Sequence, residues 1–184
     1  QCHRKGDGSK EKLLNAVAEF VILDQQPFSV VVEAPYFGHL LRTAGLDTRV
    51  SVPGLHVVTT RVAEISSDAE QVIKAELRGT RPGLTTDNWT ANDGTAYMAV
   101  TAHFIKEGDF TVNGITLSCE ECPGSHTSEK LAEMLTAYMK RYGIEHSAIT
   151  LTTDTAANIK KAGTQLLEQE WHGCAAHTIE LALK

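Results

Sequence analysis

The chain has 184 residues, of which 42% are hydrophobic and 22% are charged, and its formal net charge is −6. These values are typical of one medium globular domain, or of one domain with a helical appendage. The acidity argues against nucleic-acid binding through bulk positive charge, although a metal site built from carboxylates tolerates it. No apolar run approaches the roughly 20 residues of a membrane helix, so we expect an intracellular protein without a membrane partner.

The segment from residue 1 to residue 80 is expected to be helical. Apolar residues are dense between Glu11 and Asp24, and a short helix is expected from Tyr36 to Ala44. After Pro53 and Gly54, apolar residues recur at helical spacing and predict a long amphipathic helix that ends at Gly79. Its apolar stripe is expected to be a packing face, with an oligomer interface as the functional alternative.

The periodicity changes at residue 81. The runs GLTTDNWTA, TAYMAVTAHFI and FTVNGITLSCEE predict three strands joined by short turns, which make an antiparallel meander. A helix is expected to begin at Thr127 or Ser128 and to end at Gly143. The remaining segments predict a strand (SAITLTTD), a helix (AANIKKAGTQLLEQE), a strand (WHGCA) and the start of a helix (AHTIELALK). The order βββαβαβα indicates a mixed α/β domain over residues 81–184, in which a strand after a helix lies parallel to an earlier one.

The tetrapeptide LTTD occurs at residues 84–87 and again at residues 151–154. Because side chains alternate along a strand, Asp87 and Asp154 each point away from the face that carries their leucine. Neighbouring parallel strands would bring the two carboxylates together, where they repel one another unless a cation neutralises them. Their oxygen atoms suit Mg²⁺ or Mn²⁺. The alternative is two strand-end aspartates that only cap the next segment of the chain, with Asp154 as N-cap of a helix from Ala156.

Cysteines and histidines offer a second candidate metal site. Cys119-x-x-Cys122 and Cys174-x-x-His177 could together form a Cys₃His zinc site. Strand geometry argues against it, since residues three apart on a strand face opposite sides. Cys174 and His177 could instead share a face at a helix start. With Cys2, the four cysteines are too few for a disulfide scaffold.

Two further side chains are candidates for DNA contact. Trp89 shares a strand face with Asp87, so it could stack on a base or close the core. His126 precedes a helix start and could bind phosphate or simply lie on the surface. The basic side chains on the predicted helices are possible phosphate contacts or parts of solvated helix faces. These are Lys140, Arg141, Lys160 and Lys161.

Five segments in this order resemble the catalytic region of hAT superfamily DNA transposases and of the BED-finger proteins derived from them. They are LTTDNWT, AYMAVTAHFI, CPGSHTSEKLAEML, ITLTTDTAANIKKAG and WHGCAAHTIELAL. Upstream, QPFSVVVEAPYFGHLL and VPGLHVVTTRVAEI resemble the helical stretch that precedes that region. The resemblance extends from about Glu11 to the last residue, so the chain is similar to the N-terminal half of the catalytic region.

The resemblance implies an RNase H-like fold in which three acidic residues hold divalent metal, Mg²⁺ or Mn²⁺, for DNA cleavage and joining. The first acid falls on Asp87, the second on Asp154, and the family's Cys-x-x-His motif on Cys174 and His177. The third acid, a glutamate beyond a helical insertion, is expected after the end of this chain, which alone should be inactive or nearly so. Thr155 stands where the family commonly has asparagine. The resemblance also implies a DNA partner, a homo-oligomer in full-length form and a nuclear location.

Three functions are compatible with these residues. The first is part of an hAT-type transposase, which cleaves DNA and transfers a strand. The second is a domesticated relative, DNA-associated or dimerising, that no longer cuts. The third is a stand-alone RNase H-like nuclease, which requires a third acid within the chain. The acids available to it after Asp154 lie in predicted helices without a motif: Glu168, Glu170 and Glu180.

Overall fold

The structure is a computed structural model that describes residues 6–33, 36–47, 50–106, 108 and 110–183. Cys2 and Pro35 lie outside the described residues. The chain divides into two compact units, Gln1–Glu70 and Gln71–Lys184. No helix within the described ranges has the length and apolar character needed to cross a membrane.

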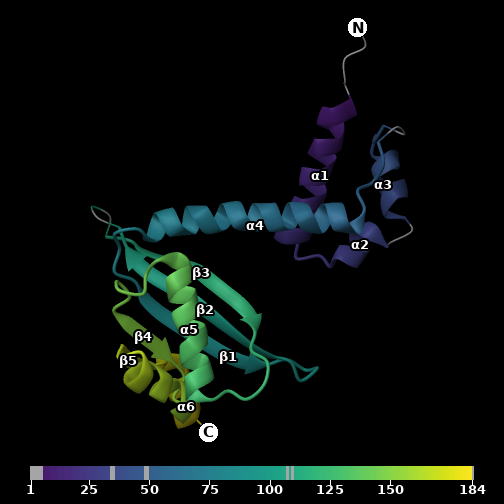
Figure 1. The fold of residues 1–184 in the computed structure, drawn as a ribbon. Helices are drawn as coiled ribbons and strands as arrows, with labels where there is room; N and C mark the ends of the chain where they lie inside the picture. Colours follow the sequence, from purple (N-terminus) through teal and green to yellow (C-terminus); the bar gives the residue numbers. More distant parts are fainter. Residues whose placement is uncertain (1–5, 34–35, 48–49, 107, 109, 184) are drawn as a thin grey trace. The chain divides into compact units, whose positions relative to one another are not determined.

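The first unit is helical. It contains α1 (Gly6–Leu23), α2 (Phe28–Val32), α3 (Phe37–Thr43) and the greater part of α4 (Leu55–Leu77), drawn in purple to blue in Figure 1. Its small core lies among α1, α2 and α4 and includes Val17, Val21, Val31 and Val58.

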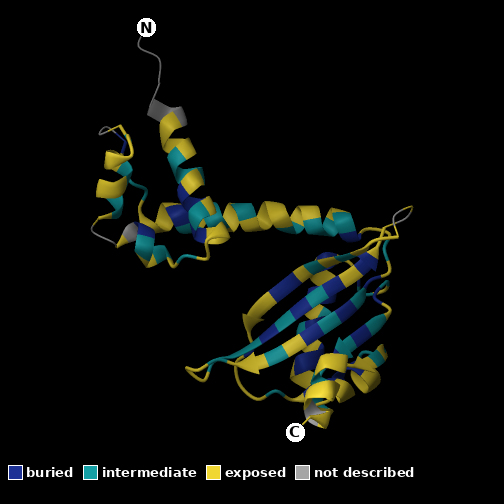
Figure 2. Ribbon diagram, turned by 180° about the vertical axis from the view of Figure 1, so that it is seen from behind, coloured by how far each residue is buried: buried dark blue, intermediate teal, exposed yellow. Residues whose placement is uncertain are grey.

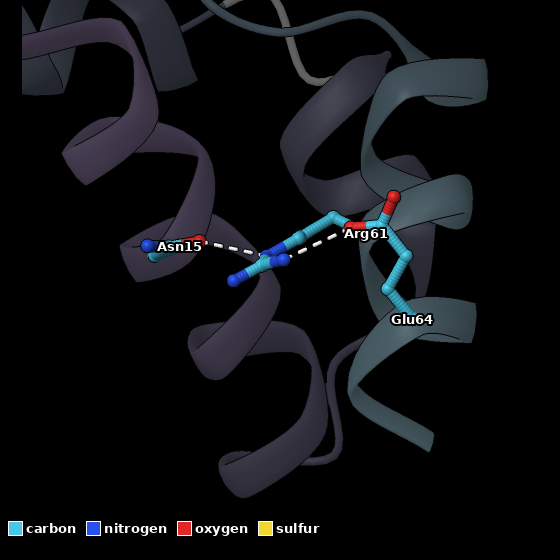
Figure 3. A network of polar contacts seen from close by, with 3 residues as sticks. All are labelled: Asn15, Arg61 and Glu64. Atoms are coloured by element: carbon cyan, nitrogen blue, oxygen red, sulfur yellow. Dashed lines mark hydrogen bonds and ion pairs between the residues drawn. The ribbon is translucent and has the colours of Figure 1, made fainter. Parts of the chain in front are cut away.

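A polar contact joins α4 to α1 beside that core. The Arg61 guanidinium donates to Asn15 Oδ1 at 2.8 Å and to Glu64 Oε2 at 2.9 Å (Figure 3). Arg61 therefore connects α4 to α1 through a residue 46 positions away in the sequence.

The second unit contains a five-stranded sheet. The strands are β1 (Gly83–Thr90), β2 (Ala96–Ile105), β3 (Val112–Glu121), β4 (Thr150–Thr153) and β5 (Glu170–Gly173). Their spatial order is β3-β2-β1-β4-β5. The first three strands form the predicted antiparallel meander, while β4 lies parallel to β1 and β5 parallel to β4. The prediction of an RNase H-like mixed α/β fold is confirmed.

One face of this sheet is covered by α5 (Ser128–Tyr142), which crosses it in Figure 1. The helix begins where Thr127 Oγ1 accepts the Lys130 N–H and ends at Gly143, whose φ of 68° is left-handed. The Tyr142 hydroxyl donates to the Leu117 carbonyl at 2.8 Å and joins the end of α5 to β3. Side chains between helix and sheet form the main core, seen as the dark blue bands of the strands in Figure 2.

The segment after β4 departs from the sequence prediction. A single helix was expected from AANIKKAGTQLLEQE, but α6 (Ala157–Lys161) passes into a π-helical turn, η1 (Ala162–Leu166), before β5 and α7 (Ala175–Ala182). At Gly163 an added Cβ would lie 2.9 Å from Leu151 Cδ2, so the backbone of η1 approaches the sheet core closely. Helical periodicity does not reveal such a tertiary constraint, and the prediction of one continuous helix was wrong.

Candidate functional site

The face of the sheet opposite α5 carries the polar side chains of β1 and β4. On β1, Leu84 and Thr86 are buried while Asp87 is exposed, so the predicted alternation holds. Thr85 of β1 pairs in parallel register with Thr152 of β4. Asp87 and Asp154 each lie two residues beyond that pair. They therefore occupy corresponding positions toward the carboxyl ends of two neighbouring parallel strands.

A cavity of about 390 Å³ opens at this position. It is lined by Asp87, Asp154, Cys174 and His177, the four residues in which the sequence predicts the acidic site and its accessory motif. The other lining residues are Thr85, Thr86, Asn88, Ala99, Thr101 and Thr152. The structure thus brings these four side chains to one cavity. Their chemical roles stay predictions.

A backbone hydrogen bond holds one carboxylate oxygen of Asp154 in place. Asp154 Oδ1 accepts the Ala156 N–H at 3.0 Å, so the carboxylate closes a tight turn. The N-cap position of α6 is Ala156, so Asp154 is not the N-cap of that helix, but its bond to the Ala156 N–H caps the start of the next segment as the alternative expects. An Asx turn of this kind commits one oxygen and leaves the other available to a cation.

Thr153, the residue before Asp154, is buried on the face of the sheet that α5 covers and makes a hydrogen bond to Asp154. The Thr153 hydroxyl donates to the Asp154 carbonyl at 2.6 Å and accepts the indole N–H of Trp171 at 2.9 Å. Thr153 and Trp171 therefore form a hydrogen-bonded pair next to Asp154.

Cys174 and His177 lie at the start of α7. Cys174 occupies the N-cap position, and its N–H donates to the Thr153 carbonyl at 2.6 Å. His177 follows within the first helical turn and lines the same cavity. The expectation that these two side chains share a helix start beside the acidic residues agrees with this arrangement.

Trp89 and His126 do not line the acidic cavity. Trp89 is 41% exposed and stacks on Tyr97 of β2, with 5.5 Å between ring centroids, so it does not close the core. His126 Nε2 lies 3.1 Å from the Cys122 carbonyl, and the His126 carbonyl accepts from Asn158 Nδ2 at 2.7 Å. His126 thus joins the loop before α5 to α6.

The Cys₃His arrangement does not form. Cys119 is exposed, whereas Cys122 is buried with its Sγ 3.4 Å from Met134 Sδ, so the two thiols diverge. Among the residues that the structure describes, no group of three or more His, Cys, Asp or Glu side chains is arranged to hold a metal ion.

The basic helix residues contact groups of the chain itself. Lys160 lies over the Trp171 ring at 4.6 Å, Lys161 pairs with Glu129 at 3.0 Å, and Arg141 pairs with Glu120 at 3.5 Å. These ion pairs are exposed and contribute little to stability.

The donor atoms of the acidic cavity fit a hard divalent cation. Two carboxylates from Asp87 and Asp154 and the hydroxyls of Thr85 and Thr152 border it. Asn88 also borders it, and its Oδ1 is buried without a hydrogen-bond partner among the described residues. The threonines and Asn88 were not singled out from the sequence, although strand alternation places Thr85 and Thr152 on the aspartate face.

Comparisons with known proteins agree with this arrangement. A family model described as the ZBED1 RNase-like domain matches residues 85–174. The chain is 26% identical to tpeD of Talaromyces stipitatus, named as a transcriptional regulator, over 92% of this chain and 22% of that protein. It is also 26% identical to a Zea mays protein named as an AC transposase, over 80% of this chain and 18% of that protein.

The chain therefore spans about a fifth of the length of these curated relatives. A solved structure, the Mos1 transposase paired-end complex with left transposon end, aligns with 98% of this chain and 63% of that chain at 12% identity and a TM-score of 0.31. At that score the likeness supports no conclusion.

Three findings point to one origin: the strand order of the five-stranded sheet, the family match over residues 85–174 and the maize relatives. These findings support a transposase-derived RNase H-like region in this chain.

Proposed function

We propose that this chain forms part of the catalytic region of an hAT-type DNA transposase, in which Asp87 and Asp154 hold divalent metal for DNA cleavage and strand transfer. The observation that carries the proposal is the shared cavity: both aspartates, Cys174 and His177 line it from β1, β4 and the start of α7. The relatives named as AC and AC9 transposases support the same function.

Each residue has a role that derives from its position. Asp87 and Asp154 supply carboxylate oxygens, with Mg²⁺ or Mn²⁺ as the matching cation. The bond from Ala156 N–H to Asp154 Oδ1 orients that carboxylate before a cation binds. A bound cation would supply charge neutralisation at the phosphate and activation of water. The Cys174 thiol and the His177 imidazole can donate hydrogen bonds to a phosphate oxygen that enters the cavity.

We propose DNA as the partner, a homo-oligomer as the active form and the nucleus as the location, on the same support. This chain supplies two carboxylates, and we propose that the third acid comes from a part of the protein beyond residue 184. The alternative is a domesticated protein that keeps the fold without cleavage. The relative named as a transcriptional regulator favours that alternative, because its name describes no cleavage.

The metal assignment is tested by Mn²⁺ binding to the chain, measured by electron paramagnetic resonance. We expect weak binding that is lost in Asp87→Asn and in Asp154→Asn, since either change removes a charged ligand from a pair. Asp68→Asn is the matched control, because Asp68 is exposed on α4 and does not line the cavity. The control should bind Mn²⁺ as the unchanged chain does.

Retention of Mn²⁺ binding in Asp154→Asn would remove Asp154 from the proposed ligands. The two functions are separated in the full-length protein by cleavage of a DNA end in the presence of Mn²⁺. Cleavage that depends on both aspartates supports the transposase, and a folded, Mn²⁺-binding protein that leaves the DNA intact supports the domesticated alternative.

A further inference from the structure

A second cavity adjoins the acidic one on the same sheet. It has a volume of about 690 Å³ and lies where β1 and β4 begin and β2 ends. Gly83, His103 and Thr150 line it, and they form the register row next to Thr85, Thr101 and Thr152 of the acidic cavity. Thr85 Oγ1 and His103 Nε2, 3.1 Å apart, connect the two cavities.

The charges of the two cavities are opposite. The described residues that line the second cavity include Arg81, His103 and Lys106 and no carboxylate. Arg81 is exposed and makes no ion pair with any described residue, whereas Lys106 pairs with Glu76. Glu107 and Asp109 come after Lys106 in the sequence and lie outside the described residues. Among the described lining residues, the unpaired positive charge beside the acidic site is therefore that of Arg81.

The backbone that carries Arg81 is fixed to the sheet. Pro82 is fully buried, and its carbonyl accepts the Ile149 N–H at 3.0 Å just before β4. A cationic side chain at this point therefore projects from a fixed position. An arginine with free donors beside threonine hydroxyls is suited to a phosphate group.

We propose that the cavity around Arg81 binds a backbone phosphate of the DNA strand whose cleavage occurs at Asp87 and Asp154. Arg81 supplies the direct contact, and Thr150 and Lys106 border the same phosphate. The proposal rests on the proposed function, because it takes DNA as the partner. It adds a positively charged contact where β1 and β4 begin, whereas the acidic residues lie toward the carboxyl ends of these strands.

The separation of the two cavities fits one DNA duplex. Gly83 and Asp87 are four positions apart along the chain, and so are Thr150 and Asp154. At about 3.3 Å per residue this is roughly 13 Å, which corresponds to about four base pairs of duplex rise. A duplex that runs along β1 and β4 therefore reaches both cavities with one continuous strand.

The test is the affinity of the 184-residue chain for a labelled duplex of about 20 base pairs, measured by fluorescence anisotropy in EDTA between about 50 and 200 mM salt. Arg81→Gln should weaken binding roughly three- to tenfold and lower the slope of log Kd against log salt concentration by about one. Arg81→Lys should keep most of the slope, because it keeps the charge. Lys130→Gln, an exposed charge on α5 at the covered face, is the matched control.

Circular dichroism establishes that each variant is folded. The proposal is overturned if Arg81→Gln binds like the control, if Arg81→Lys loses as much of the slope as Arg81→Gln, or if the unchanged chain does not bind the duplex. Because EDTA removes divalent metal, these outcomes do not depend on metal binding at the acidic site. Mn²⁺ binding by the same variants judges the proposed function separately, and Arg81→Gln should leave it unchanged.

Discussion

The two faces of the five-stranded sheet differ in what their side chains contact. On the covered face, Leu84 and Leu151 are buried beneath α5 and its neighbours. On the open face, the next residues along the same strands, Thr85 and Thr152, line the acidic cavity. A single step along a strand therefore separates a core residue from a cavity residue.

Residues that stabilise the fold and residues of the candidate site therefore lie on opposite faces of the same sheet. Burial of apolar area on one face stabilises the sheet, while the other face holds charges whose mutual repulsion the fold must tolerate. The two faces meet at Thr153, which is buried yet donates to the Asp154 carbonyl. Substitutions on β4 can test both the separation and this exception.

The largest expected effect is the loss of stability on truncating Leu151. Leu151→Ala removes a side chain that is 1% exposed, and it should lower the free energy of unfolding by about 2–5 kcal/mol. Thr152→Ala, one residue away on the open face, should change it by less than about 0.5 kcal/mol. Urea unfolding followed by circular dichroism measures both values.

Equal losses for these two neighbours would contradict the separation of the faces. If Leu151→Ala leaves the free energy of unfolding unchanged, Leu151 lies outside the core. Mn²⁺ binding offers an independent check, because a Leu151→Ala protein that remains folded should still bind the cation through Asp87 and Asp154.

A smaller effect is expected where the covered face reaches the site. Thr153→Val keeps the shape of the side chain but removes the acceptor of the Trp171 N–H and the donor to Asp154. The part-buried indole N–H then lacks its protein partner, which should cost about 1 kcal/mol of stability. Because Thr153 supports the backbone at Asp154, Mn²⁺ affinity should also fall, by up to about tenfold.

A double-mutant cycle with Trp171→Phe isolates this contact. If the hydrogen bond accounts for the stability change, the two substitutions together should cost clearly less than the sum of the two single losses. Additive losses would show that Thr153 and Trp171 act independently. Unchanged Mn²⁺ affinity in Thr153→Val would show that Asp154 keeps its position without support from the core.

The strands and their faces could be predicted because local patterns determine them. Alternation of side chains on β1 correctly separated Leu84 and Thr86 from Asp87. The helix before β4 predicted that β4 lies parallel to an earlier strand, which is β1 in the structure. The location of Asp87 and Asp154 beside one cavity resulted from that pairing. The resemblance added Cys174 and His177, which no periodicity would have connected to β1.

The remaining features depend on contacts between distant residues. The π-helical turn at Gly163 reflects its approach to Leu151, which a hydrophobic pattern does not encode. The cavity at Arg81 brings together the beginnings of β1 and β4 and the end of β2. Arg81 carried no signal in the sequence, since a single arginine before a Pro-Gly turn is ordinary.

The smallest effect is expected on the covered face at alkaline pH. Burial raises the pKa of Tyr138 above its ordinary value of about 10, and the Tyr138 hydroxyl donates to Glu120 Oε2 at 3.2 Å. The unfolded chain therefore loses this proton before the folded chain does. The stability that Tyr138 contributes is complete below about pH 10 and declines as the pH rises through the higher pKa of the folded state. Tyrosinate absorbance should show a late-ionising component among the four tyrosines, and Tyr138→Phe should reduce that component by one tyrosine and flatten the alkaline decline in stability. A late component that keeps its full size in Tyr138→Phe would assign it to another tyrosine.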